Sequence, residues 1–202
     1  MKKVINCFKE DNPVIQKKLR RVTVEEGYKI ATELLEILAT RKDGIGLAAN
    51  QIGIDAAVAV VNVREPIILI NPEIVSKSTE IPFYEGCLSF PGKGCRTKRY
   101  ETVEVISEQV EGTMIFSGVD EGDKEIRTLE AVCVQHEIDH LNGMTIMDRE
   151  HKRKPHRVSK KWGRNEIVGI TDGESYKEIK YKKAKPLIDS GKWEIYIGGP
   201  IT

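Results

Sequence analysis

The segment at 136–140 reads His-Glu-Ile-Asp-His, and it lies inside a stretch whose apolar residues repeat at helical spacing. That repeat predicts a helix over 128–142. At about 3.6 residues per turn, His136 and His140 project from the same side of such a helix. Two imidazoles so placed can bind one metal ion, with Glu137 beside the open coordination position. Polar groups on a buried helix face would otherwise each need a separate partner, so a metal site is the favoured interpretation.

The third metal ligand is not determined by this segment. One metallopeptidase pattern continues to a further histidine, but that position is Ile146 here. Cys87 follows a glycine that allows close backbone approach, and its short loop could present a thiolate together with neighbouring N–H groups. We therefore favour Cys87 over His151. Three further residues remain candidates for the third ligand: Cys95, Cys133 and Glu166. Cys133 lies one turn before His136 on the predicted helix.

A glycine-rich segment at 44–53 reads GIGLAANQIG and satisfies the spacing of a dinucleotide-binding loop. Such a loop must follow a strand and open a helix. Here a helical pattern precedes the glycines and strand-like residues follow them, so a nucleotide site is disfavoured. The alternatives are close backbone approach to a substrate, with the Gln51 amide facing a developing oxyanion, or a tight structural turn.

The remaining pattern predicts an α+β domain over 1–150, with antiparallel strands packed around the central HExxH helix. Thr23 and Glu26 have the spacing of a helix N-cap, and they predict a helix over 23–40. Residues 85–94 are rich in turn formers and predict a short strand at most. Strands are predicted over 56–63, 67–75, 102–109 and 113–119, the last two joined by a turn at Glu111-Gly112, and Gly143 is expected to end the second helix.

Charge is distributed unevenly along the 202 residues. Residues 1–150 carry 19 Lys and Arg against 25 Asp and Glu, a net −6, whereas 151–202 carry 13 against 6, a net +7. We expect 151–202 to be a basic C-terminal extension that lies near a polyanion such as nucleic acid. No apolar run is long enough for a membrane span or a secretory signal, so we expect a cytoplasmic protein. The four cysteines form no CxxC pair, and we expect their thiols to be reduced.

Three segments together resemble the peptide deformylases: GIGLAANQIG at 44–53, EGCLS at 85–89 and QHEIDHLNG at 135–143. They match that family's three motifs in the family's order, and the resemblance covers roughly residues 12–149. It implies an α+β fold and hydrolysis of the formyl group from N-formylmethionine of nascent polypeptides. It also implies one divalent metal ion, with Fe²⁺ favoured and Zn²⁺, Ni²⁺ or Co²⁺ able to occupy the site.

The resemblance also implies residue roles. Cys87, His136 and His140 would bind the metal, and Glu137 would act as general base and then acid on metal-bound water. Gln51 and the backbone N–H of Leu88 would stabilise the oxyanion. Glu85 and Arg99 would form an ion pair that braces the Cys87 loop. Substrate binding would fall to Ile45, Gly46, Leu129, Val132 and Cys133.

Two departures from the family pattern bear on substrate and partner. Family members often place a basic substrate-contacting residue seven positions after the cysteine, where this chain has Gly94, and Arg96 is the expected substitute. The tail beyond about residue 165 matches no family segment. Bacterial relatives dock a basic C-terminal helix on the ribosome, which implies a similar contact for Lys152–Lys161 in a bacterial cytoplasm, or in that of a bacterium infected by a phage.

Two competing interpretations are kept. A zinc metallopeptidase would use the same helix with a histidine or glutamate as third ligand. An RNA- or ribosome-binding protein would carry a structural metal closed by a fourth protein ligand such as Cys95.

Overall fold

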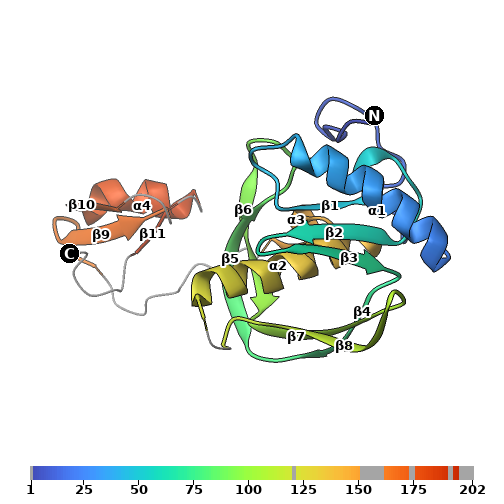
Figure 1. Cartoon of the computed structure of the whole chain (residues 1–202). Coiled ribbons are helices and arrows are strands. Elements are labelled where there is room, and N and C mark those ends of the chain that lie inside the picture. Colours follow the sequence, from blue (N-terminus) through green and yellow to red (C-terminus); the bar gives the residue numbers. More distant parts are fainter. Residues whose placement is uncertain (1, 120–121, 151–161, 173–175, 191–192, 196–202) are drawn as a thin grey trace. The chain divides into compact units, whose positions relative to one another are not determined.

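The computed structural model describes residues 2–119, 122–150, 162–172, 176–190 and 193–195. The chain divides into two compact units, Met1–His151 (unit 1) and Lys152–Thr202 (unit 2). Figure 1 labels the helices and strands of both units. Unit 1 combines helices with antiparallel strands, a mixed α and β architecture.

Helix α1 (Val24–Ala39) begins where the capping pattern predicts. The Thr23 hydroxyl accepts a hydrogen bond from the Glu26 backbone N–H at 3.2 Å. Leu34 and Leu38 are buried on the inner face of the helix. A Cβ at Gly27 would lie 2.7 Å from Ile70, so this glycine lets the helix pack closely on the sheet. The predicted first helix is therefore confirmed.

The first sheet lies between the two long helices (Figure 1). It pairs β1 (Gly46–Ala48), β2 (Val58–Asn62) and β3 (Pro66–Ile70) in that order, all antiparallel. Alternate side chains of β2 face opposite layers because side-chain direction alternates along a strand. Val58 and Val60 pack with α1, whereas Ala59 and Val61 pack with residues of α2.

The predicted strand over 67–75 is wrong, because the structure breaks it into two. Asn71 adopts a left-handed backbone conformation (φ 51°) between β3 and β4 (Glu73–Lys77). Its side-chain amide donates to the Val22 carbonyl at 2.7 Å, and its Oδ1 accepts from the Val22 N–H at 3.0 Å. These two bonds hold the bend, so the chain leaves the first sheet and enters the second.

The second sheet pairs β4, β7 (Thr102–Ser107) and β8 (Val110–Ser117) in that order. Ser107 pairs with Val110, so the turn between β7 and β8 occupies residues 108–109. The predicted turn at Glu111-Gly112 is therefore wrong, and those residues belong to β8.

The strands β5 (Glu80–Gly86) and β6 (Gly94–Tyr100) form a hairpin that flanks the stretch at 85–94 predicted to be turn-rich. Only residues 87–93 connect its two seven-residue strands. The prediction of a turn-rich stretch with a short strand at most over 85–94 is therefore confirmed. The strands over 80–84 and 95–100 were not predicted, because their buried side chains are largely polar. Glu85, Thr97 and Arg99 are all buried, so no apolar alternation marks the strands in the sequence.

Helix α2 (Lys124–Leu141) is deeply buried over its second half, where every residue from Glu130 to Leu141 is buried. It begins one turn before the predicted start at Thr128, because the Asp123 carboxylate caps the N–H groups of Glu125 and Ile126. Gly143 follows the helix with φ 73°, as predicted for the residue that ends it. The short helix α3 (Ile146–Arg149) comes next.

Unit 2 has its own small core. It contains β9 (Ile167–Thr171), β10 (Tyr176–Lys180), α4 (Tyr181–Asp189) and β11 (Glu194–Ile195), with the strands in antiparallel order β10-β9-β11. Lys152–Lys161 lies outside the described residues. No helix in the described part of the chain has both the length and the apolar character to cross a membrane. The core consists of Val168, Ile170 and Ala184, packed with Trp162, Ile179, Tyr181, Ile188 and Trp193.

Candidate active site

Helix α2 presents three neighbouring polar side chains in a buried setting. His136 and His140 lie on the same side of the helix, with ring centroids 4.9 Å apart. Nδ1 of His136 is 2.7 Å from Oε2 of Glu85 on β5. Because a carboxylate only accepts hydrogen bonds, Nδ1 carries the proton and Nε2 of His136 is left to face the Cys87 side.

The Cys87 loop follows β5 directly and brings a thiol to the two imidazoles. Sγ of Cys87 is 3.3 Å from Nε2 of His140. Cys87, His136 and His140 each offer one ligand atom, and these atoms lie within 4.8 Å of one another. A set of one thiolate and two imidazoles suits a divalent transition metal.

The electrostatics of the group also fit a cation. Burial lowers the pKa of His140 well below its usual value, and the charge of His136 acts in the same direction, so the His140 imidazole is neutral. Burial alone would lower the pKa of His136, but hydrogen bonds with Cys87 and Glu85 and the charge of Glu137 raise it well above the usual value. The surroundings of Nε2 therefore favour a positive charge, which a bound metal ion would supply.

The other donors considered for the third ligand are occupied elsewhere. Sγ of Cys133 donates to the Ile45 carbonyl at 3.6 Å, and Sγ of Cys95 donates to the Ile146 carbonyl at 3.2 Å. Glu166 belongs to unit 2. His151 lies outside the described residues. Within the described part of the chain, the ligand group therefore includes neither Cys95 nor Cys133.

Glu137 follows His136 in the chain and is buried, with the residue 2% exposed. Burial raises its pKa to about 7, although the charge of His136 opposes the shift. Its Oε2 has no hydrogen-bond partner among the described residues. A buried carboxylate with a free oxygen and a pKa near neutrality is suited to accept and return a proton.

Gln51 lies on the 3₁₀ turn η1 (Ala49–Ile52), directly after β1. Its Oε1 accepts from the Ala48 N–H at 2.8 Å, which fixes the amide orientation. The Nε2 group therefore points to Sγ of Cys87 at 3.5 Å and to Oγ of Ser89 at 3.4 Å. The glycine-rich segment thus forms a short strand and a 3₁₀ turn, and it lacks the helix that a dinucleotide site requires.

The backbone N–H of Leu88 is a second donor beside Cys87. No described residue accepts a hydrogen bond from it. Two donors, the Leu88 N–H and the Gln51 amide, are therefore close to the ligand group from two different loops.

One cavity of about 540 Å³ collects these groups. Gln51, Cys87, Leu88, His136 and Glu137 all line it. Gly94 and Lys93 line the same cavity, but Arg96 does not, so the structure does not support Arg96 as the substitute basic residue. The five residues expected to bind substrate also lie on its wall: Ile45, Gly46, Leu129, Val132 and Cys133.

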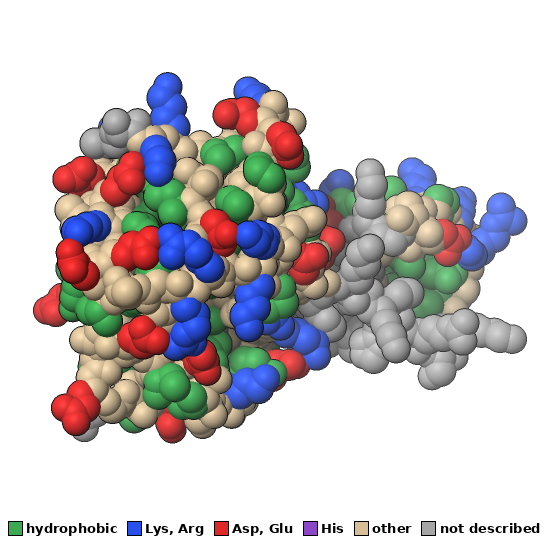
Figure 2. Space-filling view, turned by 90° about the vertical axis from the view of Figure 1, so that its right-hand side faces the viewer, with side chains coloured by type: hydrophobic (Ala, Val, Ile, Leu, Met, Phe, Trp, Pro, Cys, Tyr) green, Lys and Arg blue, Asp and Glu red, His purple; other side chains and the backbone are tan. Residues whose placement is uncertain are grey.

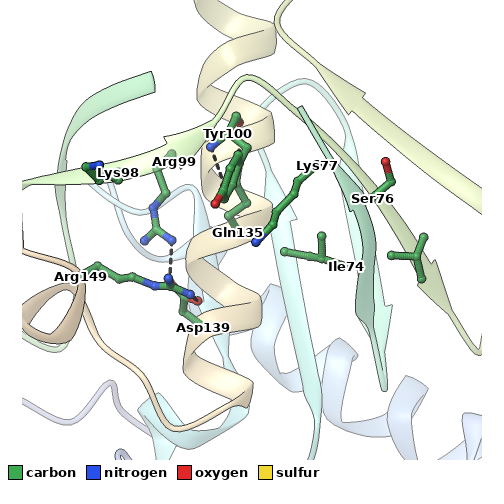
Figure 3. A pocket seen from close by; sticks show the side chains of 10 residues that line it. Ile74, Ser76, Lys77, Lys98, Arg99, Tyr100, Gln135, Asp139 and Arg149 are labelled. Atoms are coloured by element: carbon green, nitrogen blue, oxygen red, sulfur yellow. Dashed lines mark hydrogen bonds and ion pairs between the residues drawn. The ribbon is translucent and has the colours of Figure 1, made fainter. Parts of the chain in front are cut away.

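An ionic network joins the β5–β6 hairpin to α2 and α3. Arg99 donates to both oxygens of Glu85 at 2.7 and 3.0 Å and to Asp139 at 2.5 Å. Figure 3 shows Arg99 and Arg149 pointing towards the same Asp139 carboxylate. Burial alone would raise the pKa of Glu85, but hydrogen bonds from His136 and Arg99 lower it to about 2. Glu85 therefore stays charged while it orients His136.

Three contributors to the site were missed in the sequence. Asn50 donates to the His140 carbonyl at 2.7 Å and so ties η1 to α2. The Asp139 carboxylate accepts hydrogen bonds from both Arg99 and Arg149. The Ser89 hydroxyl accepts a hydrogen bond from the Gln51 side-chain amide. The motif segments contain Asn50, Ser89 and Asp139, so their presence was visible, but the partners come from distant parts of the chain.

The N-terminal segment also supports the site, and no sequence signal pointed to it. The Ile5 N–H donates to the Gln51 carbonyl, and the Cys7 N–H donates to the Ser89 carbonyl, both at 2.9 Å. The Phe8 ring meets the Phe90 ring edge-on at 5.4 Å. Residues 5–8 thus connect the loop that carries Gln51 with the loop that carries Cys87.

Comparison with known proteins gives a consistent result. Residues 4–156 match the profile of the family described as Polypeptide deformylase. A peptide deformylase from Buchnera aphidicola subsp. Acyrthosiphon pisum (strain Tuc7) is 35% identical over 138 residues, which cover 66% of this chain and 75% of that protein. The matched range falls almost entirely in unit 1.

Solved structures of similar proteins agree with the sequence match. The crystal structure of peptide deformylase from Thermotoga maritima has a TM-score of 0.61 at 31% identity and covers 75% of this chain and 98% of that one. A peptide deformylase from Synechococcus elongatus, solved in complex with actinonin, has a TM-score of 0.58 at 34% identity. The match covers 69% of this chain and 75% of that one.

Proposed function

The chain belongs to the polypeptide deformylase family, whose members remove N-formyl groups from nascent peptides, and we propose that it does so with the metal-dependent site on α2. The observation that carries this proposal is the grouping of Cys87, His136 and His140 beside a cavity that Cys87, His136 and Glu137 line. Cys87, His136 and His140 would hold the ion. The chemistry that the ion would supply there is a lowered pKa of water and polarisation of the formyl oxygen.

Glu137 is the proton carrier of the proposed reaction. Its carboxylate accepts a proton from the attacking water and later delivers it to the departing amine. The pKa of about 7 supports both roles near neutral pH, because neither the charged nor the neutral form is strongly disfavoured. The formyl carbon then leaves as formate, and the peptide retains a free amino terminus.

Gln51 and Leu88 stabilise the oxygen of the formyl group as negative charge develops on it. The Ala48 N–H fixes the Gln51 amide with its NH₂ group towards Cys87, so this donor is oriented before substrate arrives. Loss of one such donor typically costs about 10²–10³ in rate.

The apolar wall of the cavity would bind the methionine side chain. Ile45, Leu129 and Val132 supply aliphatic surface. Burial raises the pKa of Cys133 well above its usual value, so its thiol stays neutral and suits the same slot. Gly46 offers its backbone to the peptide.

The ion itself is proposed to be Fe²⁺, with Zn²⁺, Ni²⁺ or Co²⁺ accommodated by the same donors. A ferrous thiolate site is sensitive to oxygen, so the protein should be purified anaerobically. The proposed setting is the cytoplasm of a bacterium, or of the bacterial host if the chain is encoded by a phage.

The first test is formate release from N-formylmethionyl peptides by the Fe²⁺- or Ni²⁺-loaded protein. N-acetylated and unformylated peptides are the controls. We expect release that disappears in Glu137→Ala while the metal stays bound. Absence of release from a folded, loaded protein would contradict the proposal.

A metallopeptidase with the same helix is distinguished by its third ligand. Cys87→Ser should strongly weaken metal binding in the proposed deformylase. In a peptidase that uses a histidine or glutamate as third ligand, the same change would leave metal binding largely intact.

A ribosome contact through 151–202 is the second part of the proposal. The net charge of +7 in this segment supports binding to polyanionic RNA. Lys182 and Lys183 are exposed on α4. Changing both to Glu should weaken co-sedimentation with ribosomes, and unchanged sedimentation at several salt concentrations would contradict it.

A further inference from the structure

Tyr84 and Gly94 form an unusual cross-strand contact in the β5–β6 hairpin. Gly94 lies opposite Gly86, two residues from the Tyr84–Arg96 pair, so all four residues belong to the same face of the hairpin. A Cβ built on Gly94 would lie 2.5 Å from Oη and 2.7 Å from Cζ of Tyr84. The phenol end of the ring therefore occupies the space that any side chain at position 94 would need.

The ring is both exposed and part of the candidate active site. Tyr84 is 57% exposed, which is unusual for a large aromatic side chain that makes a close contact. Tyr84 and Gly94 line the same cavity as His136 and Glu137. Leu88 and Phe90 also line it, so the ring continues an apolar wall.

We propose that the Tyr84 ring, lying across Gly94, binds an aromatic or large aliphatic side chain from the first two residues that follow formylmethionine. This inference rests on the proposed deformylase function and names a substrate preference for it. Tyr84 acts as a specificity residue, since the hydrogen bonds made by the metal-ligand group within the described part of the chain do not include it.

The expected binding depends on the exposed face of the Tyr84 ring. A glycine leaves the backbone bare, and an aromatic side chain that covers it presents a flat apolar surface with little conformational freedom. Stacked or edge-on aromatic pairs contribute beyond their buried area, by an amount that corresponds to a factor of about two to ten in binding. A side chain at position 94 would displace the ring and remove this surface.

The test compares kcat/KM for formate release from formyl-Met-Phe-Ala, formyl-Met-Ala-Phe and formyl-Met-Ala-Ala. We expect the full-length, metal-loaded protein to prefer one phenylalanine peptide over the alanine peptide by about two- to tenfold, mainly through KM. Tyr84→Ala should bring this ratio close to one, and Tyr84→Phe should keep it, because the ring and not the hydroxyl makes the surface.

Gly94→Ala provides an independent variant. The added methyl group meets the free end of a flexible side chain, so the hairpin can keep its fold while the ring moves. We expect the ratio to fall as it does in Tyr84→Ala. Tyr28→Ala, at a 45% exposed tyrosine on α1, is the matched control and should leave the ratio unchanged.

The peptide comparison distinguishes failure of this substrate preference from failure of the proposed deformylase function. Formate release with the same peptide ratio in Tyr84→Ala and in the unmodified protein overturns this inference alone. Absence of release from every peptide overturns the proposed function and this inference with it.

Discussion

Nδ1 of His136 donates a hydrogen bond to Oε2 of Glu85 across 2.7 Å, and Arg99 holds the same carboxylate from its other side. This arrangement fixes both the tautomer and the ring plane of His136. Nε2 of His136 is therefore oriented towards Cys87 before any ion is bound. The quality of the proposed metal site depends on a residue that is not itself a ligand.

Glu85→Gln should lower metal affinity by about 10–100-fold. The neutral amide accepts a weaker hydrogen bond from Nδ1 and leaves Arg99 with Asp139 as its remaining ionic partner. Competition with a fluorescent chelator would measure the change. Glu80→Gln is the matched control, because Glu80 lies on the same strand and pairs with Lys98 at the surface. Equal affinities for the two variants would show that Glu85 does not support the ligands.

Gly46→Ala should reduce kcat by about 10²-fold or more, with metal content unchanged. The new Cβ would lie 2.4 Å from Oε1 of Glu137 and 2.7 Å from Sγ of Cys133. The carboxylate must move, and proton transfer depends on its position. Gly163→Ala is the control, since its Cβ would make only an ordinary contact, 3.7 Å from Glu166. Full activity with both variants would remove Glu137 from the proposed role.

The parts of the site that could be predicted from the sequence are those set by local spacing. His136 and His140 share a helix face because of the helical repeat, and Thr23 caps α1 through a bond only three residues long. The association of Cys87 with this helix was favoured from the chemistry of its glycine-flanked loop and from the family resemblance, since no local rule brings together residues 49 positions apart.

The rest depends on tertiary contacts between polar groups. Glu85 and Arg99 are buried in a hairpin whose inner face is polar, so the usual apolar alternation is absent. The bend at Asn71 is held by bonds to Val22, 49 residues away. Propensity rules describe neighbours along the chain and carry no information on such partners.

Asp139→Ala should lower the free energy of unfolding of unit 1 by about 3 kcal/mol. Arg99 and Asp139 are both buried, and removal of the carboxylate leaves the guanidinium with less compensation. Lys98→Ala, at an exposed ion pair, should cost less than about 1 kcal/mol. Urea unfolding followed by far-ultraviolet circular dichroism would measure both. Similar costs for the two changes would contradict a structural role for the buried network.

Metal removal should destabilise unit 1 and spare unit 2. A bound ion would join the Cys87 loop to α2, and at a free concentration about 100 times Kd it would add about 2.7 kcal/mol to the folded state. Both tryptophans, Trp162 and Trp193, belong to unit 2, so their fluorescence reports on that unit, whereas circular dichroism is dominated by α1 and α2. A chelator should therefore lower the melting temperature seen by circular dichroism and leave the fluorescence transition in place. Equal shifts in both signals would mean that the two units unfold together, and no shift in either would mean that Cys87, His136 and His140 hold no ion in the folded protein.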